Sequence, residues 1–197
     1  MSLFDESARK RVDFEIEMGD SFDYSFMGIV NIQDLVVVEK SRDNDETTPI
    51  KPRSKISSIR LQSNKIENIS ILHGCIESIG LVPRHVKWID LSNNNISHIG
   101  ESLENFHGLS VLYLHANNIK NLSEVKALSN LKKLTSITLF GNPIESHKHY
   151  KKYVLYLFPS LSKLDFSVIT NQDREDCRAW ASVFRKWLKE GQSVVDV

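Results

Sequence analysis

One arrangement of apolar and polar positions recurs along the chain. The arrangement is apolar-x-x-apolar-x-apolar-x-x-Asn-x-apolar, and complete copies begin at Ile56, Val86, Leu109 and Leu134. A fifth copy begins at Leu161 but lacks the asparagine. The starts lie 30, 23, 25 and 27 residues apart. Because self-similarity at such a period is typical of stacked repeats, the pattern predicts a solenoid.

The spacing within each copy predicts what one unit of the solenoid contains. Its centre alternates with period two, which predicts a short strand with one buried face, and the segment between copies supplies the crossover that parallel strands need. Helical spacing from Leu122 to Leu131 predicts a convex-side helix. Each asparagine follows the strand, where its amide can bond backbone groups that the turn would otherwise bury unpaired. We therefore expect an α/β solenoid with short parallel strands on its concave side, convex helices or turns, and a ladder of asparagines: Asn64, Asn94, Asn117 and Asn142.

Both ends of such a stack need a cover, because a terminal repeat exposes its core. Residues 22–38 are rich in apolar side chains and are expected to cover the N-terminal end. Residues 39–54 are polar, contain two prolines and suggest an exposed loop. An apolar helical face over residues 150–158 predicts a C-terminal helical cap. The last apolar residues of the fifth copy are expected to be buried at the end of the core: Leu161, Leu164 and Phe166.

Residues 171–190 predict one further helix with an apolar stripe. This helix is expected either to pack on the cap or to dock into a partner protein, and the pattern favours packing on the cap. The stripe consists of Trp180, Val183, Phe184, Trp187 and Leu188. The chain then divides into a mobile charged tail (1–21), a capping segment with a loop (22–54), the repeats (55–147) and a C-terminal cap with its terminal helix (148–197).

Charge and composition exclude several functions. The 25 Lys and Arg residues balance 25 Asp and Glu residues, which argues against a surface that binds nucleic acid all over. The balance hides an asymmetry, because residues 1–50 carry five bases against twelve acids and residues 51–197 carry twenty against thirteen. One hypothesis is that residues 1–20 lie back on the basic repeats until a partner displaces them. The chain has no apolar run long enough to span a membrane and no secretion signal, and two distant cysteines fit a reducing intracellular compartment.

The sequence contains no recognisable catalytic motif. It has no glycine-rich phosphate loop, no GxSxG and no metal-binding pair of cysteines. His147 and His149 lie close to Glu145, a spacing that can hold a metal but is more typical of an exposed loop before a helix. We therefore expect a protein that is not an enzyme and has no cofactor or metal ion.

Function must then come from a surface, and the strand alternation predicts the concave one. Trp88, Tyr113 and Phe140 occupy positions beside the buried strand residues, so the core does not require them. Large exposed aromatics are the usual anchors of protein interfaces, although these rings could instead cover one another or lie under a terminal segment. Charged neighbours would orient a partner more than hold it. The predicted protein-binding residues are Arg60, Trp88, Asp90, Tyr113, His115, Thr138 and Phe140.

Six lysines offer a competing surface near the C-terminal end of the repeats. A basic cluster can meet RNA phosphates or an acidic protein, and it can equally be a solvated end of the solenoid. The six are Lys132, Lys133, Lys148, Lys151, Lys152 and Lys163.

Several motifs resemble a known family. The asparagine repeats, and the sequence GNPI followed by the aromatic cap, resemble the intracellular, phosphatase-regulator-like class of leucine-rich repeat proteins. Within that class the chain resembles the leucine-rich-repeat-containing protein 51 family. The motifs lie in the same order between about residues 22 and 174: DYSF (23–26), IQDL (32–35), WIDLS (88–92), LSVLYLH (109–115) and DFS (165–167).

The resemblance implies a small cytoplasmic protein without catalytic activity. The family is associated with ciliated cells, which implies a scaffold role in the axoneme of the cilium or flagellum. We expect an adaptor, monomeric outside its complex, that binds another protein through its concave face. One alternative is a component of an RNA–protein particle, because the cap also resembles that of the leucine-rich A-prime subunit of a spliceosomal particle. Another alternative is a regulatory subunit of an enzyme such as a phosphatase.

Overall fold

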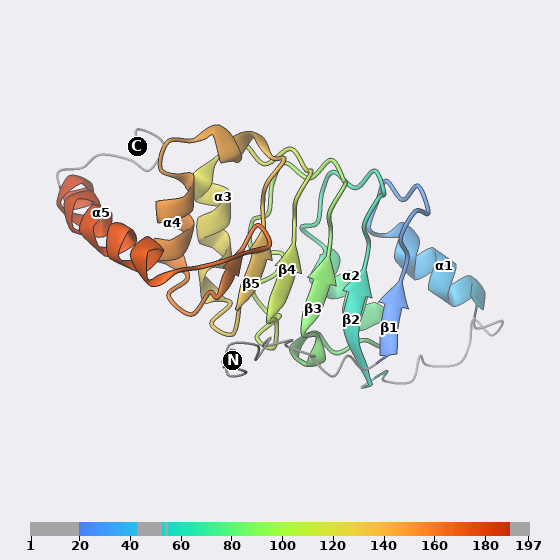
Figure 1. Ribbon diagram of the computed structural model, residues 1–197. Helices are drawn as coiled ribbons and strands as arrows, with labels where there is room; N and C mark the ends of the chain where they lie inside the picture. The colour runs from blue at the N-terminus through green and yellow to red at the C-terminus, as the bar shows by residue number, and fades with distance from the viewer. Residues whose placement is uncertain (1–19, 43–52, 54, 190–197) are drawn as a thin grey trace, which may run out of the picture.

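Each repeat contributes one short strand, and the strands lie side by side in chain order as a seven-stranded sheet (Figure 1). The computed structural model describes residues 20–42, 53 and 55–189. Strands β1 to β6 run parallel, and β7 runs antiparallel to β6. The strands are β1 (Asp20–Asp23), β2 (Ile56–Arg60), β3 (Trp88–Asp90), β4 (Val111–Tyr113), β5 (Ser136–Thr138), β6 (Lys163–Leu164) and β7 (Ser167–Val168).

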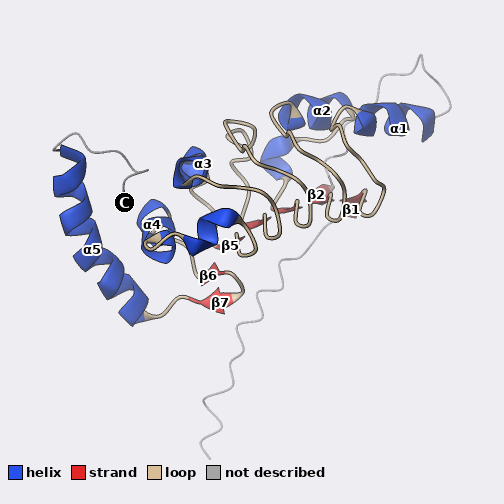
Figure 2. Cartoon of the chain, turned by 90° about the horizontal axis from the view of Figure 1, so that it is seen from above, coloured by secondary structure: helices blue, strands red, loops and turns tan. Residues whose placement is uncertain are grey.

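Helices and turns form the opposite layer. Figure 2 shows the strands in a row along the inner side of the solenoid and α1 to α4 along its outer side. The apolar positions of the repeats fill the core between the two layers. The helices are α1 (Asp34–Arg42), α2 (Leu72–Ser78), α3 (Leu122–Ala127), α4 (Tyr150–Leu157) and α5 (Asn171–Lys189), with 3-10 turns at Pro83–His85, Leu128–Asn130 and Pro143–Ser146. The predicted α/β solenoid with concave parallel strands is confirmed.

The expected asparagine ladder runs along one edge of the sheet. Asn117 donates to the carbonyl oxygens of Leu91 and Leu114, both at 3.0 Å, and its amide oxygen accepts the N–H of Ile96 at 2.9 Å. Leu91 and Ile96 belong to the preceding repeat, so each rung joins one repeat to the one before it. The other three rungs form the equivalent bonds: Asn64, Asn94 and Asn142.

The N-terminal segment adds a unit of its own to the stack. Strand β1 pairs in parallel with β2, and both Phe22 and Tyr24 are buried. The oxygen of Asn64 accepts the N–H groups of Met27 and Ile29, each at 3.0 Å. Because this unit has no asparagine at the ladder position, its turn depends on the rung of the following repeat.

The polar stretch that begins at residue 39 is partly helical, which corrects the loop expected for residues 39–54. Helix α1 continues to Arg42, and Glu39 within it is buried and forms an ion pair with Arg53. The charge of Glu39 suggested a solvent-exposed position, but the carboxylate can be buried because the Arg53 guanidinium neutralises it. The rest of the expected loop lies outside the described residues. So does the tail of residues 1–19, and with it the hypothesis that the tail covers the repeats.

At the C-terminal end, β6 and β7 form a hairpin where the sequence suggested a last buried turn. Its two loop residues, Asp165 and Phe166, both have positive φ, at 51° and 61°, as a type I′ turn requires. The reversal carries Phe166 out of the core, so its side chain is 57% exposed. The expectation that Phe166 is buried is therefore wrong, whereas Leu161 and Leu164 are buried.

Helix α5 packs against α4 and closes the C-terminal end (Figure 1). Phe184 is buried and meets Tyr153 edge to face, with ring centroids 5.9 Å apart. Trp180 stacks on Phe184 at 4.5 Å. Val183 and Leu188 are exposed. Most of the predicted stripe thus serves the cap, as favoured, and only its outer margin faces solvent.

Candidate functional site

The strand register brings the predicted concave residues into neighbouring columns. Arg60 lies beside Asp90, Asp90 beside Tyr113, and Tyr113 beside Thr138. Trp88 lies in the adjacent column, at the start of β3. Because consecutive strands lie about 4.8 Å apart, side chains in one column touch across the sheet.

Five rings meet on this face, and we call them the aromatic row: Trp88, Tyr113, His115, Phe140 and Phe166. Trp88 meets Tyr113 edge to face, with centroids 5.7 Å apart. His115 stacks on Phe140 at 4.7 Å, with an angle of 6° between the planes. Phe166 contacts Tyr113 at 5.4 Å, His115 at 5.7 Å and Phe140 at 5.9 Å. These contacts hold the rings in fixed positions and leave an apolar surface facing the concavity.

Phe166 is the member of the row that the sequence did not reveal. The left-handed conformation costs a non-glycine residue roughly 1–2 kcal/mol, and here two such residues follow each other. Asp165 fixes the turn, because its Oδ1 accepts the N–H groups of Leu139 and Phe140 and its Oδ2 accepts the hydroxyl of Tyr150 at 2.7 Å. The available signal was the missing asparagine of the fifth copy, with an aspartate directly before Phe166.

The charged groups of the face differ in how they are paired. The Arg60 guanidinium lies 5.1 Å from the centre of the Trp88 ring and 3.8 Å from the carboxylate of Asp23. Asp90 is only 8% exposed. Its Oδ1 accepts the N–H of Ser92 at 2.9 Å and the Ser92 hydroxyl at 2.5 Å. Within the described residues its Oδ2 takes part in no hydrogen bond and its carboxylate in no ion pair.

Thr138 supports the face without forming part of its surface. Its side chain is fully buried, and its hydroxyl lies 2.8 Å from Nδ1 of His115. Burial lowers the pKa of His115, against the opposing charges of Asp90 and Asp165. Burial likewise raises the pKa of Tyr113. Both rings are therefore uncharged at neutral pH, and the buried Thr138 contributes to the face only by orienting His115.

The lysines of the competing basic surface are partly paired. Lys151 Nζ lies 2.6 Å from Asp173 Oδ1, and its hydrogen bond is the main cause that lowers the pKa of Asp173 to about 2. Lys132 donates to the carbonyl oxygen of Ser129 at 2.7 Å. Part of the positive charge expected from the sequence is thus neutralised by the fold.

The histidine pair beside the cap serves local structure. The N–H of His149 donates to Nδ1 of His147 at 3.3 Å, and the His149 ring packs on Trp180 with centroids 5.6 Å apart. Across the described part of the chain no group of three or more His, Cys, Asp or Glu side chains could hold a metal ion. In that same part no helix has the length and apolar character to span a bilayer.

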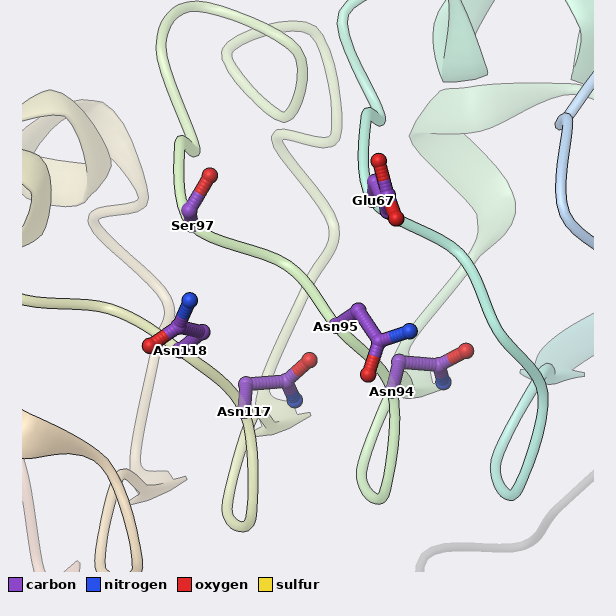
Figure 3. Close-up of a pocket in the computed structure, with 6 residues that line it drawn as sticks. All are labelled: Glu67, Asn94, Asn95, Ser97, Asn117 and Asn118. Carbon is purple, nitrogen blue, oxygen red and sulfur yellow. The ribbon is translucent and has the colours of Figure 1, made fainter.

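A shallow hollow of about 430 Å³ lies beside the asparagine ladder. Figure 3 shows Asn94 and Asn117 on neighbouring turns, with both amides pointing toward the preceding repeat. Those amides are already bonded within the ladder. The remaining lining residues are exposed polar side chains: Glu67, Asn95, Ser97 and Asn118. The ladder amides are therefore occupied within the fold, and the rest of the hollow is lined by ordinary exposed side chains.

Comparison with known proteins agrees with this architecture. Residues 56–194 match the family model described as leucine-rich repeat. The chain is 38% identical over 159 residues to leucine-rich repeat-containing protein 51 of Mus musculus, and the alignment covers 80% of this chain and 83% of that protein. It is 36% identical over 179 residues to the Homo sapiens protein of the same name, with 85% and 90% covered.

A solved structure extends the comparison to three dimensions. The fold resembles a chain in the crystal structure of the Drosophila melanogaster SNF/U2A' complex, with a TM-score of 0.56 and 29% identity, covering 70% of this chain and 76% of that chain. The repeats, the ladder, the capped ends and these similarities agree on one assignment. The chain belongs to the leucine-rich repeat-containing protein 51 family.

Proposed function

We propose that this protein is a non-catalytic adaptor that binds another protein through the aromatic row. The main support is Phe166, because the fold keeps this large ring 57% exposed at a backbone position that disfavours it. Burying the ring would follow the repeat pattern and remove an apolar surface from water. Phe26 shares the exposure and the positive φ, but Phe166 in addition contacts three other rings of the row. A cluster of exposed aromatics is typical of a binding anchor.

The rigidity of the face also supports this proposal. The rings contact one another, and parallel strands fix their backbones. A partner would thus meet a preformed surface, which limits the entropy lost when the two proteins associate. Arg60 and Asp90 beside the rings would set the orientation of the partner.

The direct test is affinity capture from cell extracts with the full chain as bait. We expect Trp88→Ala combined with Tyr113→Ala to remove the captured proteins while the circular dichroism spectrum stays unchanged. Phe26→Ala is the matched control, because Phe26 is also an exposed phenylalanine with positive φ but lies outside the aromatic row. Undiminished capture of the same proteins by the double variant would refute the proposal.

We further propose that the adaptor acts in the cytoplasm and in the axoneme of cilia, a setting supported only by the family resemblance. A tagged chain expressed in ciliated cells should then fractionate with the axoneme after detergent extraction. Capture should also yield proteins from ciliated cells that extracts of non-ciliated cells lack. Equal recovery from both cell types would count against an axonemal role.

A second candidate function is a subunit of an RNA–protein particle, favoured by the likeness to the chain in the SNF/U2A' complex. If this chain contacts RNA itself, binding should be salt-sensitive and weaken when Lys148, Lys151 and Lys152 are changed to Gln. The Lys151–Asp173 ion pair makes the effect of Lys151 the smallest of the three. Filter binding at low salt provides the measurement, and no retained RNA would exclude an autonomous RNA-binding activity.

A further inference from the structure

Building on the proposed function, we propose that the concave face recognises a basic side chain of its protein partner. The cationic group, from a lysine or an arginine, would lie between the carboxylate of Asp90 and the rings of the aromatic row. This names the chemistry of the partner, which the adaptor function alone leaves open.

The state of Asp90 is the first support. The residue is only 8% exposed, and nearly buried carboxylates are normally paired or fully hydrogen-bonded. Oδ1 receives two bonds from Ser92, whereas Oδ2 receives none within the described residues. An ionised carboxylate has room for about four donors. Half of this acceptor capacity therefore faces the concavity unused.

The field over the row is the second support. The carboxylates of Asp90 and Asp165 both act on the ring of His115, so both charges lie close to the row. Asp165 has its oxygens bonded to two backbone N–H groups and to the hydroxyl of Tyr150. It adds negative charge, and with three bonds it has less unused acceptor capacity than Asp90. The rings themselves are neutral, so the centre of the face attracts a cation.

The chain's own Arg60 provides the third support. Its guanidinium lies 5.1 Å from the centre of the Trp88 ring, the geometry of a cation–π contact. The charge of Arg60 is directed to Asp23 on the neighbouring strand. Among the described residues no other cation lies over a ring of the row. Tyr113, which lies beside Asp90 on the next strand, therefore offers a second place of the same kind.

The same arrangement discriminates against other partners. A neutral or acidic side chain that covered Asp90 would remove the carboxylate from water without offering it a donor, which costs binding free energy. A basic side chain lays its aliphatic stem on the rings and directs its charge to the carboxylate. The face should thus select against partners that lack a basic residue.

A random 12-residue peptide library displayed on phage provides the test, with the full chain as bait. Asp90→Asn removes the charge and keeps an oxygen that can accept both bonds from Ser92. Asp23→Asn is a matched control, because Asp23 bonds Ser25 in the same way, at 3.0 Å and 2.6 Å, but its carboxylate is paired with Arg60 at 3.8 Å. Tyr113→Ala reports on the face as a whole.

The proposal expects lysine or arginine to be enriched at one position by the natural chain and by Asp23→Asn, and not by Asp90→Asn. The best peptide should bind at least tenfold more weakly when its arginine is replaced by citrulline or its lysine is acetylated. Peptides that need Tyr113 but show no basic preference would overturn this inference and leave the proposed function intact. If no enriched peptide needs Tyr113, both fail.

Discussion

The asparagine ladder and the aromatic row both run along the solenoid, yet they differ in composition, in burial and in the bonds that their side chains form. The ladder repeats one residue type, is buried, and bonds its amides to backbone groups of adjacent repeats. The row uses four types of ring at its five positions, and Phe166 within it is mostly exposed. A column that repeats the same buried residue therefore serves to stabilise the fold. A column whose members vary and stay accessible is available for binding.

Removing one rung should produce the largest effect on stability. Asn117→Ala deletes bonds to the carbonyls of Leu91 and Leu114 and to the N–H of Ile96. The two carbonyls keep a bond from Asn94 and from Asn142, whereas the buried N–H of Ile96 is left unpaired. We expect the free energy of unfolding to fall by about 3 kcal/mol, measured by urea denaturation. Asn118→Ala is the control, since that neighbouring asparagine is exposed. Equal effects of the two substitutions would break the distinction between ladder and surface.

The aromatic row should show the opposite behaviour within the same repeat. Tyr113→Ala is expected to weaken binding of the captured partner by about thirtyfold, roughly 2 kcal/mol. The free energy of unfolding should change much less than with Asn117→Ala, because Tyr113 is only half-buried. Isothermal titration and urea denaturation on the same preparation give both values. A large loss of stability with little loss of affinity would show that Tyr113 stabilises the fold and does not bind the partner.

Asp165 ties the turn that carries Phe166 to the neighbouring backbone, and Tyr150 allows this support to be tested. The Tyr150 hydroxyl donates to Asp165 Oδ2, and burial together with this carboxylate raises the pKa of Tyr150. Tyr150→Phe should lower the free energy of unfolding by about 1.5 kcal/mol and also weaken partner binding, because the turn that presents Phe166 loses one of its supports. Unchanged partner affinity would show that the hairpin does not depend on the bond.

The smallest expected effect on stability is that of Phe166→Gly. Glycine relieves the left-handed strain, but it raises the entropy of the unfolded chain and removes the ring contacts. The free energy of unfolding, measured by thermal denaturation, should therefore change by less than about 1 kcal/mol. Partner affinity should nevertheless fall about tenfold. If stability drops by more than 2 kcal/mol, the ring serves the fold and the comparison needs revision.

The sequence predicted the parts of the fold that follow from a local rule. The buried positions Ile59 and Leu61, the strand at each copy and the ladder asparagines all follow from residue spacing. The helical stretch from Leu122 to Asn130 also follows the predicted spacing. Each of these features depends on neighbours that are close in the sequence or in the next copy of the same pattern.

The features that escaped prediction depend on partners without a pattern. Glu39 looks like a loop residue until Arg53 is placed beside it. Phe166 looks like a core residue until the hairpin reverses the chain, which depends on bonds from Asp165 to β5 and α4. Of the predicted concave residues, Thr138 is fully buried. The sequence did not predict this, because the strand alternation says which face a side chain is on but not how exposed it is.

The backward direction of the ladder bonds determines how the molecule can open. The amide protons of Ile66, Ile96 and Ile119 each bond to the asparagine of the following repeat, so each is released only when that junction separates. In a stack whose units touch only their neighbours, the ends separate more readily than the middle. Hydrogen exchange at these three protons, each at a different junction, should therefore report opening repeat by repeat. A bound partner that spans several strands should slow exchange at the junctions beneath it.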